Sequence, residues 1–138
     1  MKKYSIGYTQ GVFDMFHVGH LNILLRAKEL CESLVVGVNA DALVMDYKMK
    51  RPVIPESDRM RIVESVKYVD KVLLAQTLDK EAMWHLVGFN ALFIGSDWKG
   101  SERWTETALR MSEHGVDTVF PSHTDGISSS MLRTLINI

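Results

Sequence analysis

The chain has 138 residues, of which 46% are hydrophobic and 24% are charged, and this length fits one domain of about 100–150 residues. Its 16 Lys and Arg residues against 17 Asp and Glu residues give a net charge of −1, which excludes the broad basic surface of a nucleic-acid-binding protein. The single cysteine, Cys31, excludes a disulfide framework, and no run of about 18 apolar residues is present, so we expect a cytoplasmic protein without a membrane span.

The first third of the chain predicts a strand, a loop, a helix and a second strand. Polar and apolar residues alternate over Tyr4–Tyr8, as in a β-strand, and the loop Gln10–Phe16 follows. Apolar residues then recur at helical spacing over Val18–Cys31. Leu34–Val38 is a short apolar run typical of a buried parallel strand.

The middle of the chain begins with its least regular stretch. Met45–Pro55 is predicted to be a mobile loop, and Glu56–Val66 has helical composition. Lys71–Leu74 is predicted to be the third strand. Asp79–Val87 is predicted to be a helix, because Asp79 can cap its first turn and the glycine after Val87 can end it.

The last third repeats the alternation of strands and helices. Ala91–Ile94 and Thr118–Phe120 are predicted strands, and Arg103–His114 is the helix between them, ended by a glycine. The segment Ser129–Ile136 is predicted to be a final helix, with the preceding serine as its cap. Strands that alternate with helices indicate an α/β fold, with right-handed crossovers between parallel strands.

We therefore expect residues 1–138 to form a single Rossmann-like domain, with a five-stranded parallel sheet flanked by helices. In such sheets ligands bind beyond the carboxyl ends of the strands, at the point where the strand order reverses. The loops after Tyr8, Val38, Ile94 and Phe120 are the expected positions of a site.

The loop between the first strand and the first helix carries the first candidate site, Gly11-Val-Phe-Asp14-Met-Phe-His17-Val-Gly19-His20. The two glycines permit close backbone approach, and the two histidines lie three residues apart, so both can face one side of a helix. A helix N-terminus suits a phosphate, to which two imidazoles add directed donors. The alternatives are a structural turn with surface histidines and a metal-binding pair, although a catalytic metal normally has a third protein ligand.

Basic residues are concentrated in one later stretch of an otherwise balanced chain: Lys48, Lys50, Arg51, Arg59 and Arg61. Because this stretch follows the second predicted strand, we expect it near the same sheet edge as the histidines. Two anions, such as a triphosphate and a phosphorylated acceptor, need about this many cations. The alternative is a solvated charged face.

Two further loops follow predicted strands. Residues 123–130, His-Thr-Asp-Gly-Ile-Ser-Ser-Ser, provide hydroxyl and N–H groups for a second anion site, or simply a capped helix. In residues 94–100, Asp97 can accept hydrogen bonds from a ribose or base or stabilise a turn, and Trp98 can pack in the interior. The P-loop and dinucleotide-binding glycine patterns are both absent, which argues against a P-loop ATPase and a dinucleotide-dependent oxidoreductase.

Four elements, in chain order, resemble those of the cytidylyltransferase branch of the nucleotidyltransferase superfamily. Residues 11–20 resemble its His-x-Gly-His element, and residues 123–130 resemble its Arg-Thr-Glu-Gly-Ile-Ser-Thr-Thr element. Lys67-Tyr-Val-Asp70 resembles its Arg-Tyr-Val-Asp, and residues 94–98 its Gly-Asp-Asp-Trp loop. The resemblance extends from Tyr4 to Ile136 and is greatest to small bacterial glycerol-3-phosphate cytidylyltransferases.

The resemblance implies roles for particular residues, with the two histidines holding the nucleotide phosphates and stabilising the transition state. Its catalytic positions correspond to His17, His20, Lys48 and Arg59. Its acceptor-binding positions correspond to Lys50, Lys67 and His123. Its nucleotide-binding positions correspond to Gly11, Phe13, Asp14, Gly19, Asp97, Trp98, Thr124, Gly126, Ile127, Ser128, Ser129 and Ser130. It implies no metal ligand from the chain itself, and Mg²⁺ is expected to arrive with the triphosphate.

Two positions depart from the pattern of that branch. Lys67 and His123 stand where the branch has arginines, and neither side chain has the planar fork that binds a phosphate through two parallel hydrogen bonds. The identity of the acceptor is therefore left open, and to a lesser degree so is the identity of the nucleotide base. Related branches use ATP with sugar phosphates or flavin mononucleotide, and Arg51-Pro52-Val53 is similar to the heptose-phosphate adenylyltransferases.

The resemblance implies in-line transfer of CMP from CTP to a small phosphorylated alcohol, above all glycerol 3-phosphate, with release of pyrophosphate. A phosphomonoester has a second pKa of about 6, so it is a nucleophile near neutral pH, and catalysis rests on positioning and charge stabilisation. A homodimer with residues 67–70 near its interface is also implied. The alternatives are an adenylyltransferase, a nucleotide-binding module without activity, and a metal-binding protein using His17, His20 and His123.

Overall fold

The computed structural model describes residues 2–95 and 102–121. Five strands are β1 (Tyr4–Gly11), β2 (Cys31–Asn39), β3 (Lys71–Ala75), β4 (Ala91–Phe93) and β5 (Asp117–Val119). The helices are α1 (Val18–Leu30), α2 (Asp41–Lys48), α3 (Glu56–Glu64), α4 (Lys80–Val87) and α5 (Glu102–Ser112).

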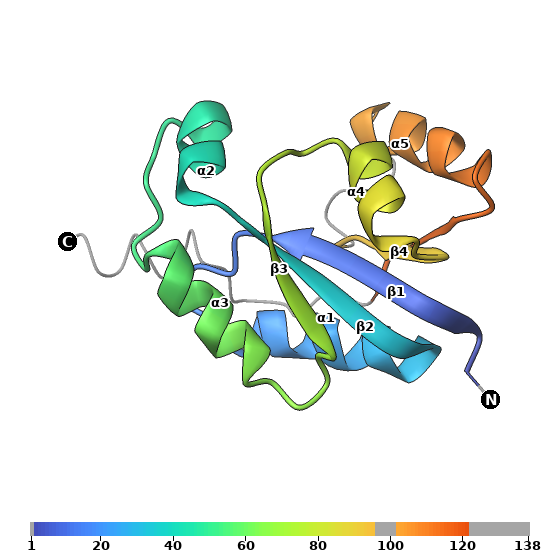
Figure 1. The fold of residues 1–138 in the computed structure, drawn as a ribbon, viewed down its shortest axis with the longest axis horizontal. Helices are drawn as coiled ribbons and strands as arrows, with labels where there is room; N and C mark the ends of the chain where they lie inside the picture. Colours follow the sequence, from blue (N-terminus) through green and yellow to red (C-terminus); the bar gives the residue numbers. More distant parts are fainter. Residues whose placement is uncertain (1, 96–101, 122–138) are drawn as a thin grey trace.

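The strands form one parallel sheet in the order β3-β2-β1-β4-β5. Helices α1 and α3 cover one face, α4 and α5 cover the other, and α2 lies beyond the carboxyl ends of the strands (Figure 1). The chain adds β2 and β3 on one side of β1 and then crosses to add β4 and β5 on the other. The predicted α/β fold with a five-stranded parallel sheet is therefore confirmed, and its strand order reverses between β1 and β4.

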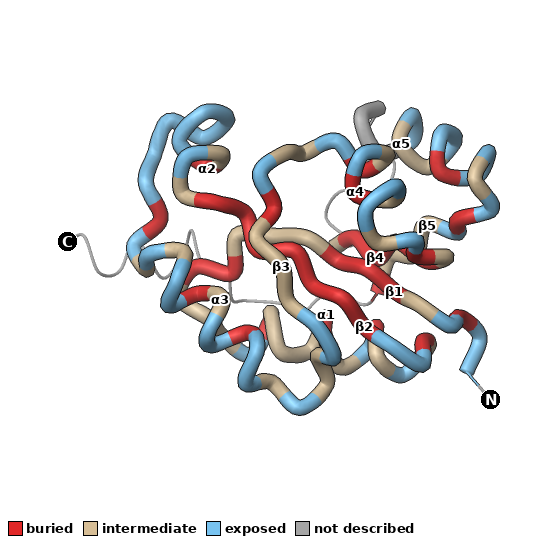
Figure 2. Tube along the Cα trace, viewed as in Figure 1, coloured by how far each residue is buried: buried red, intermediate tan, exposed pale blue. Residues whose placement is uncertain are grey.

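Each face of the sheet has its own apolar cluster, and the central strands are buried on both faces (Figure 2), as expected for parallel strands covered by helices. On the α4–α5 face, the Tyr8 ring stacks on Phe89 with ring centroids 4.9 Å apart. Gly37 of β2 makes room for this tyrosine, because a Cβ there would lie 2.1 Å from the Tyr8 hydroxyl. Burial raises the pKa of Tyr8 above its usual value.

The two predicted ends of α4 are confirmed. The Asp79 carboxylate accepts hydrogen bonds from the backbone N–H groups of Glu81 and Ala82, and Gly88 ends the helix in the left-handed conformation at φ 75°. The glycine after α5, Gly115, also has φ 75°. No helix within the described residues is long and apolar enough to cross a membrane.

Two predicted boundaries near the carboxyl ends of the strands were wrong. Gln10 belongs to β1 rather than to the following loop, because the pairing of β1 with β2 continues to Gly11. Part of the predicted loop Met45–Pro55 is helical, because α2 extends to Lys48 and ends at Met49 with φ 59°. The predicted final helix, Ser129–Ile136, lies outside the described residues.

Candidate active site

His17 and His20 are fixed by the start of α1. His17 is the N-cap residue, and its Nδ1 accepts the backbone N–H of Gly19 at 3.0 Å. The Nδ1 of His20 in turn accepts the backbone N–H of His17 at 3.2 Å. A backbone N–H can only donate, so each neutral ring carries its proton on Nε2. The cap of the helix thereby leaves both Nε2–H groups as directed donors.

Both histidines are held in the neutral form. Their rings stack with centroids 3.9 Å apart. Burial lowers the pKa of His17, and burial together with the neighbouring His17 lowers the pKa of His20 to about 4. The Nε2 atom of His17 is buried and has no hydrogen-bond partner among the residues that the structure describes. A buried donor without a partner is costly, and a phosphate oxygen can satisfy it.

The loop before these histidines has an unusual backbone. Phe13 and Met15 have φ values of 53° and 48°, in the left-handed region that non-glycine residues occupy at a cost of about 1–3 kcal/mol. The Phe13 ring packs edge-on against the His20 ring, with ring centroids 5.4 Å apart. The Phe16 ring also contacts His20, with ring centroids 5.3 Å apart. Gly11 gives room for this packing, since a Cβ there would lie 3.3 Å from the Phe13 ring.

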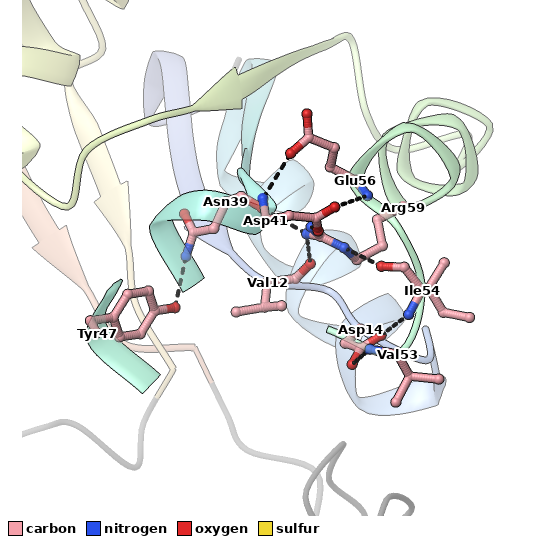
Figure 3. Close-up of polar contacts among 9 residues, drawn as sticks. All are labelled: Val12, Asp14, Asn39, Asp41, Tyr47, Val53, Ile54, Glu56 and Arg59. Atoms are coloured by element: carbon pink, nitrogen blue, oxygen red, sulfur yellow. Dashed lines mark hydrogen bonds and ion pairs between the residues drawn. The ribbon is translucent and has the colours of Figure 1, made fainter. Parts of the chain in front are cut away.

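Asp14 joins this loop to the segment before α3. Its buried carboxylate accepts the backbone N–H groups of Val53 at 2.8 Å and Ile54 at 2.9 Å (Figure 3). These bonds place the segment after α2 beside the β1–α1 loop. The contact of Asp14 with the nucleotide site that the resemblance implies stays a prediction.

Arg59 is fully buried, and its guanidinium bonds to the protein on several sides (Figure 3). It donates to the backbone oxygens of Ile54, Val12 and Asn39, each at 2.8 Å, and to the Asp41 carboxylate. Four hydrogen bonds thus use donors of a group that has five. Arg59 therefore ties together the β1–α1 loop, the end of β2, the start of α2 and the segment before α3, and its catalytic role stays a prediction.

Helices α2 and α3 cap each other. The first N–H group of α2, on Asp41, donates to Glu56 at 2.8 Å, and the first N–H group of α3, on Glu56, donates to Asp41 at 3.3 Å. The N-cap residues themselves, Ala40 and Pro55, make no side-chain cap. Together with Arg59, this exchange fixes the angle at which both helices leave the sheet edge.

A chain of side-chain hydrogen bonds follows the carboxyl edge of β1, β2 and β3. Gln10 Nε2 donates to the Thr77 backbone oxygen and to Asn39 Oδ1, both at 2.9 Å, and Gln10 Oε1 accepts the Tyr8 hydroxyl at 2.6 Å. Asn39 Nδ2 donates to the Tyr47 hydroxyl oxygen at 3.1 Å (Figure 3). This network could not be predicted from the sequence, since Gln10 and Asn39 are 29 residues apart and share no motif.

The predicted basic residues occupy three different environments. Lys48, Lys50 and Arg51 are exposed at the end of α2 and just after it, on the site side of the sheet. Arg59 is buried, as described above. Lys67 lies between α3 and the first residue of β3, so it is at the amino end of the strands, opposite to His17. Its ammonium lies 5.3 Å from the centroid of the Tyr68 ring.

The remaining predicted site residues lie outside the described part of the chain. They are Asp97, Trp98, His123, Thr124, Gly126, Ile127, Ser128, Ser129 and Ser130. Over residues 2–95 and 102–121, no group of three or more His, Cys, Asp or Glu side chains is placed to hold a metal ion.

Comparison with known proteins identifies one family. A family model described as cytidylyltransferase-like matches residues 8–135. FAD synthase from Korarchaeum cryptofilum is 34% identical over 132 residues, which cover 93% of this chain and 89% of that protein. The bifunctional protein HldE from Nitratiruptor sp. is 39% identical over 98 residues, 70% of this chain and 21% of that protein. The chain thus spans about a fifth of that HldE protein's length.

Two solved structures are similar to this chain. The lipopolysaccharide core biosynthesis protein from Thermoplasma volcanium has a TM-score of 0.74 and 25% sequence identity, and the match covers 90% of this chain and 99% of that one. Pantothenate synthetase from Thermus thermophilus has a TM-score of 0.59 at 14% identity, over 97% of this chain and 66% of that one. This second likeness concerns the fold alone.

Proposed function

The chain belongs to the cytidylyltransferase-like family of nucleotidyltransferases, and from this membership we propose that it transfers an adenylyl group from ATP to a phosphomonoester and releases pyrophosphate. ATP is preferred to the CTP of the sequence-based hypothesis because a relative that matches nearly the whole chain is named for an adenine-containing product, FAD. Glycerol 3-phosphate, the acceptor first expected, has no support from the relatives described above.

The observation that carries the proposal is the pair of neutral histidines at the start of α1. An oxygen of the acceptor phosphate attacks the α-phosphorus of ATP, and the bond from this phosphorus to the oxygen bridging to the β-phosphorus breaks. Negative charge accumulates on the phosphoryl oxygens during this step. The Nε2–H groups of His17 and His20 are already oriented by backbone bonds, so they stabilise that charge without rearrangement.

The surrounding charges complete the proposed site. Lys48 and Lys50, which are exposed after the carboxyl end of β2, would neutralise the triphosphate or the acceptor phosphate. Mg²⁺ bound to the triphosphate would supply further positive charge. Arg59 acts as a positioning residue through Asp41 and the backbone, not as a ligand of the nucleotide.

A product-release panel tests the proposal. Pyrophosphate formation is measured with ATP and with CTP, each in the presence of Mg²⁺ and a series of phosphomonoesters, and products are identified by mass spectrometry. With ATP we expect pyrophosphate and a second product in which the adenylyl group is joined to the phosphate of the acceptor. The absence of pyrophosphate with either nucleotide and every acceptor would overturn the proposal.

Cytidylyl transfer from CTP is the second candidate, because the family model that matches the chain is cytidylyltransferase-like. The same panel separates the two, since the nucleotide with the higher kcat/KM at equal acceptor concentration is the donor. The expected homodimer is tested alongside by sedimentation velocity of the purified chain.

A further inference from the structure

Helix α2 extends beyond the carboxyl ends of the strands and is largely exposed (Figure 2). Of its eight residues only Val44 is buried, and the residue before its first turn, Ala40, makes no side-chain cap. A helix of this length is not stable on its own in water, so contacts at its two ends must hold it. Asp41 fixes the first end through the contacts described above. The other end carries Lys48, the first cation of the proposed site.

The second end of α2 is attached to the sheet through Tyr47. The attachment begins at the Thr77 backbone oxygen, which can only accept, so the bonded atom of the Gln10 amide must be its nitrogen. The same nitrogen donates to Asn39 Oδ1, which leaves Asn39 Nδ2 to donate to the Tyr47 hydroxyl oxygen at 3.1 Å (Figure 3). Because Asn39 is buried at the end of β2, its amide is a fixed point from which the last turn of α2 is held.

The ring of Tyr47 also contacts the cation that follows it. The Lys48 ammonium lies 5.8 Å from the centroid of the Tyr47 ring, within the range of about 6 Å in which a cation is attracted to an aromatic face. A lysine has a flexible four-carbon stem and loses much rotamer freedom when its ammonium is fixed. Tyr47 is therefore tied to β2 by its hydroxyl group and restricts Lys48 by its ring.

The segment after α2 is held at its far end as well. Met49 has φ 59°, a left-handed conformation that persists in a non-glycine residue only where the surrounding structure enforces it. Four residues later, the backbone N–H of Val53 donates to the Asp14 carboxylate beside the loop that carries the histidines. The chain from Tyr47 to Val53 thus runs between two fixed points, which limits the positions that the Lys48 ammonium can take.

We propose that Tyr47 is a positioning residue for the nucleotidyl transfer: its hydroxyl group ties the end of α2 to Asn39, and its ring holds the Lys48 ammonium where a phosphate of the nucleoside triphosphate binds. This inference rests on the proposed function and adds to its site a residue that none of the sequence motifs contains. Tyr47 touches no reacting atom and acts through Lys48. Because the lysine is ordered before the nucleotide arrives, less ordering remains to be done on binding, and the charge is already in place.

A double-mutant cycle of Tyr47→Phe and Lys48→Met tests whether Tyr47 acts through Lys48. Pyrophosphate release gives kcat/KM for the nucleotide that the product-release panel selects, with Mg²⁺ and the best acceptor. Tyr47→Phe, which keeps the ring and removes the hydroxyl group, should lower kcat/KM about three- to tenfold, and Lys48→Met should lower it about 10²-fold. In the Lys48→Met background, Tyr47→Phe should change kcat/KM by less than about twofold. Equal effects of Tyr47→Phe in the two backgrounds, or an unchanged kcat/KM in either single variant, would overturn the inference.

Tyr4→Phe is the matched control, because Tyr4 makes the same kinds of contact at the amino ends of the strands. Its hydroxyl group donates to the Asp117 carboxylate at 2.8 Å, and the Lys3 ammonium lies 5.5 Å from the centroid of its ring. Loss of this hydroxyl group should leave kcat/KM within about twofold of the wild type. A loss of kcat/KM as large as that of Tyr47→Phe would trace the effect to a weakened fold in general and overturn the inference.

Amide hydrogen exchange tests the attachment of α2 without turnover. The backbone N–H of Met49 donates to the Met45 oxygen at 3.0 Å at the end of α2, and that of Gly88 donates to the Trp84 oxygen at 2.8 Å at the end of α4. Tyr47→Phe should speed exchange at Met49 about three- to tenfold, because the helix end opens more often, and leave exchange at Gly88 unchanged. Unchanged exchange at Met49 would overturn the inference whatever the kinetics show.

Failure of the proposed function has a different signature. If no acceptor yields pyrophosphate with ATP or CTP, the proposed function fails, and the same cycle is then measured on the Kd of each nucleotide with Mg²⁺ by isothermal titration calorimetry. A Tyr47→Phe effect on Kd that disappears in the Lys48→Met background supports the positioning of Lys48 by Tyr47. The absence of nucleotide binding, or equal effects in the two backgrounds, overturns it.

Discussion

Helices α2 and α3, beside the candidate active site, begin differently from α4 on the other face of the sheet. α4 begins at Asp79, whose carboxylate caps N–H groups two and three residues later. α2 and α3 begin at Ala40 and Pro55, which provide no cap, and Asp41 and Glu56 cap each other's helix instead. The start of α4 is fixed by its neighbours in sequence, whereas the starts of α2 and α3 are fixed by residues that the fold brings together. Substitutions at Asp41 or Glu56 should therefore act over both helices, and substitutions at Asp79 only locally.

The largest effect on stability is expected from Arg59→Met. This change leaves the Asp41 carboxylate and three backbone oxygens without their donor inside the fold, and removing one partner of a buried ion pair costs about 3–5 kcal/mol. Urea unfolding measures this loss in the free energy of unfolding. Arg61→Met, on the exposed side of the same helix, should change the free energy of unfolding by less than about 0.5 kcal/mol. An Arg59→Met protein of wild-type stability but without turnover would mean that Arg59 contacts the substrate.

His17→Asn distinguishes the role of His17 as the cap of α1 from its proposed role as a hydrogen-bond donor in catalysis. Asparagine is a good N-cap residue, so the free energy of unfolding should stay within about 1 kcal/mol of the wild type. The Nε2–H donor is lost, and kcat should fall about 10²–10³-fold, as for removal of one oxyanion-stabilising donor. Asp79→Asn makes the equivalent exchange at α4 and should leave kcat unchanged. Loss of stability without loss of kcat would show that His17 serves the helix alone.

The start of α1 should also make the stability of the fold sensitive to acid. The pKa of His20 is lowered to about 4 in the fold, whereas an unfolded histidine has a pKa of about 6.5. Between these values the unfolded chain binds more protons, so stability falls as the pH is lowered from about 6.5 towards 4, and it is fully retained above 6.5. At pH 5.5 this component costs on the order of 1 kcal/mol. Urea unfolding of wild type and His20→Gln at pH 7 and 5.5 measures the difference, and identical pH dependence would contradict it.

The smallest effect is expected at the locally capped helix. Asp79→Ala removes two hydrogen bonds at the start of α4 and should lower the free energy of unfolding by about 1 kcal/mol. It should leave kcat and both KM values unchanged, because the change stays within one helix end. Asp41→Ala, at the site, should in contrast raise KM for the nucleotide or the acceptor in addition to lowering stability. Equal kinetic effects of the two variants would remove the distinction between the faces.

Local signals explain which parts of the fold could be predicted from the sequence. Asp79 and the glycine at 88 mark the ends of α4 because a cap and a left-handed residue act within one turn. The apolar runs of β2 and β4 were recognisable because strands buried on both faces are continuously apolar. The end of β1 at Gly11 and the helix α2 were missed, since their partners, such as Glu56 for α2, come from elsewhere in the chain.

The candidate site also has features that local sequence predicts and features that only the tertiary fold shows. The start of α1 was predicted to present two histidines at an anion site, because their spacing is a local property. In the sequence, Arg59 is one more cation in a basic stretch, and only the tertiary fold shows that it is buried against Asp41. The positive φ angles of Phe13 and Met15 could not be predicted either, because non-glycine residues adopt them only when surrounding contacts enforce them.

The central claim is that two neutral histidines stabilise transfer of a nucleotidyl group, and His20→Ala tests it most directly. The measurement is single-turnover pyrophosphate release with saturating ATP, Mg²⁺ and the best acceptor of the panel, on wild type and variant proteins shown by circular dichroism to be folded. We predict a loss of about 10²–10³-fold in rate for His20→Ala. A folded His20→Ala protein that releases pyrophosphate at the wild-type rate would contradict the account.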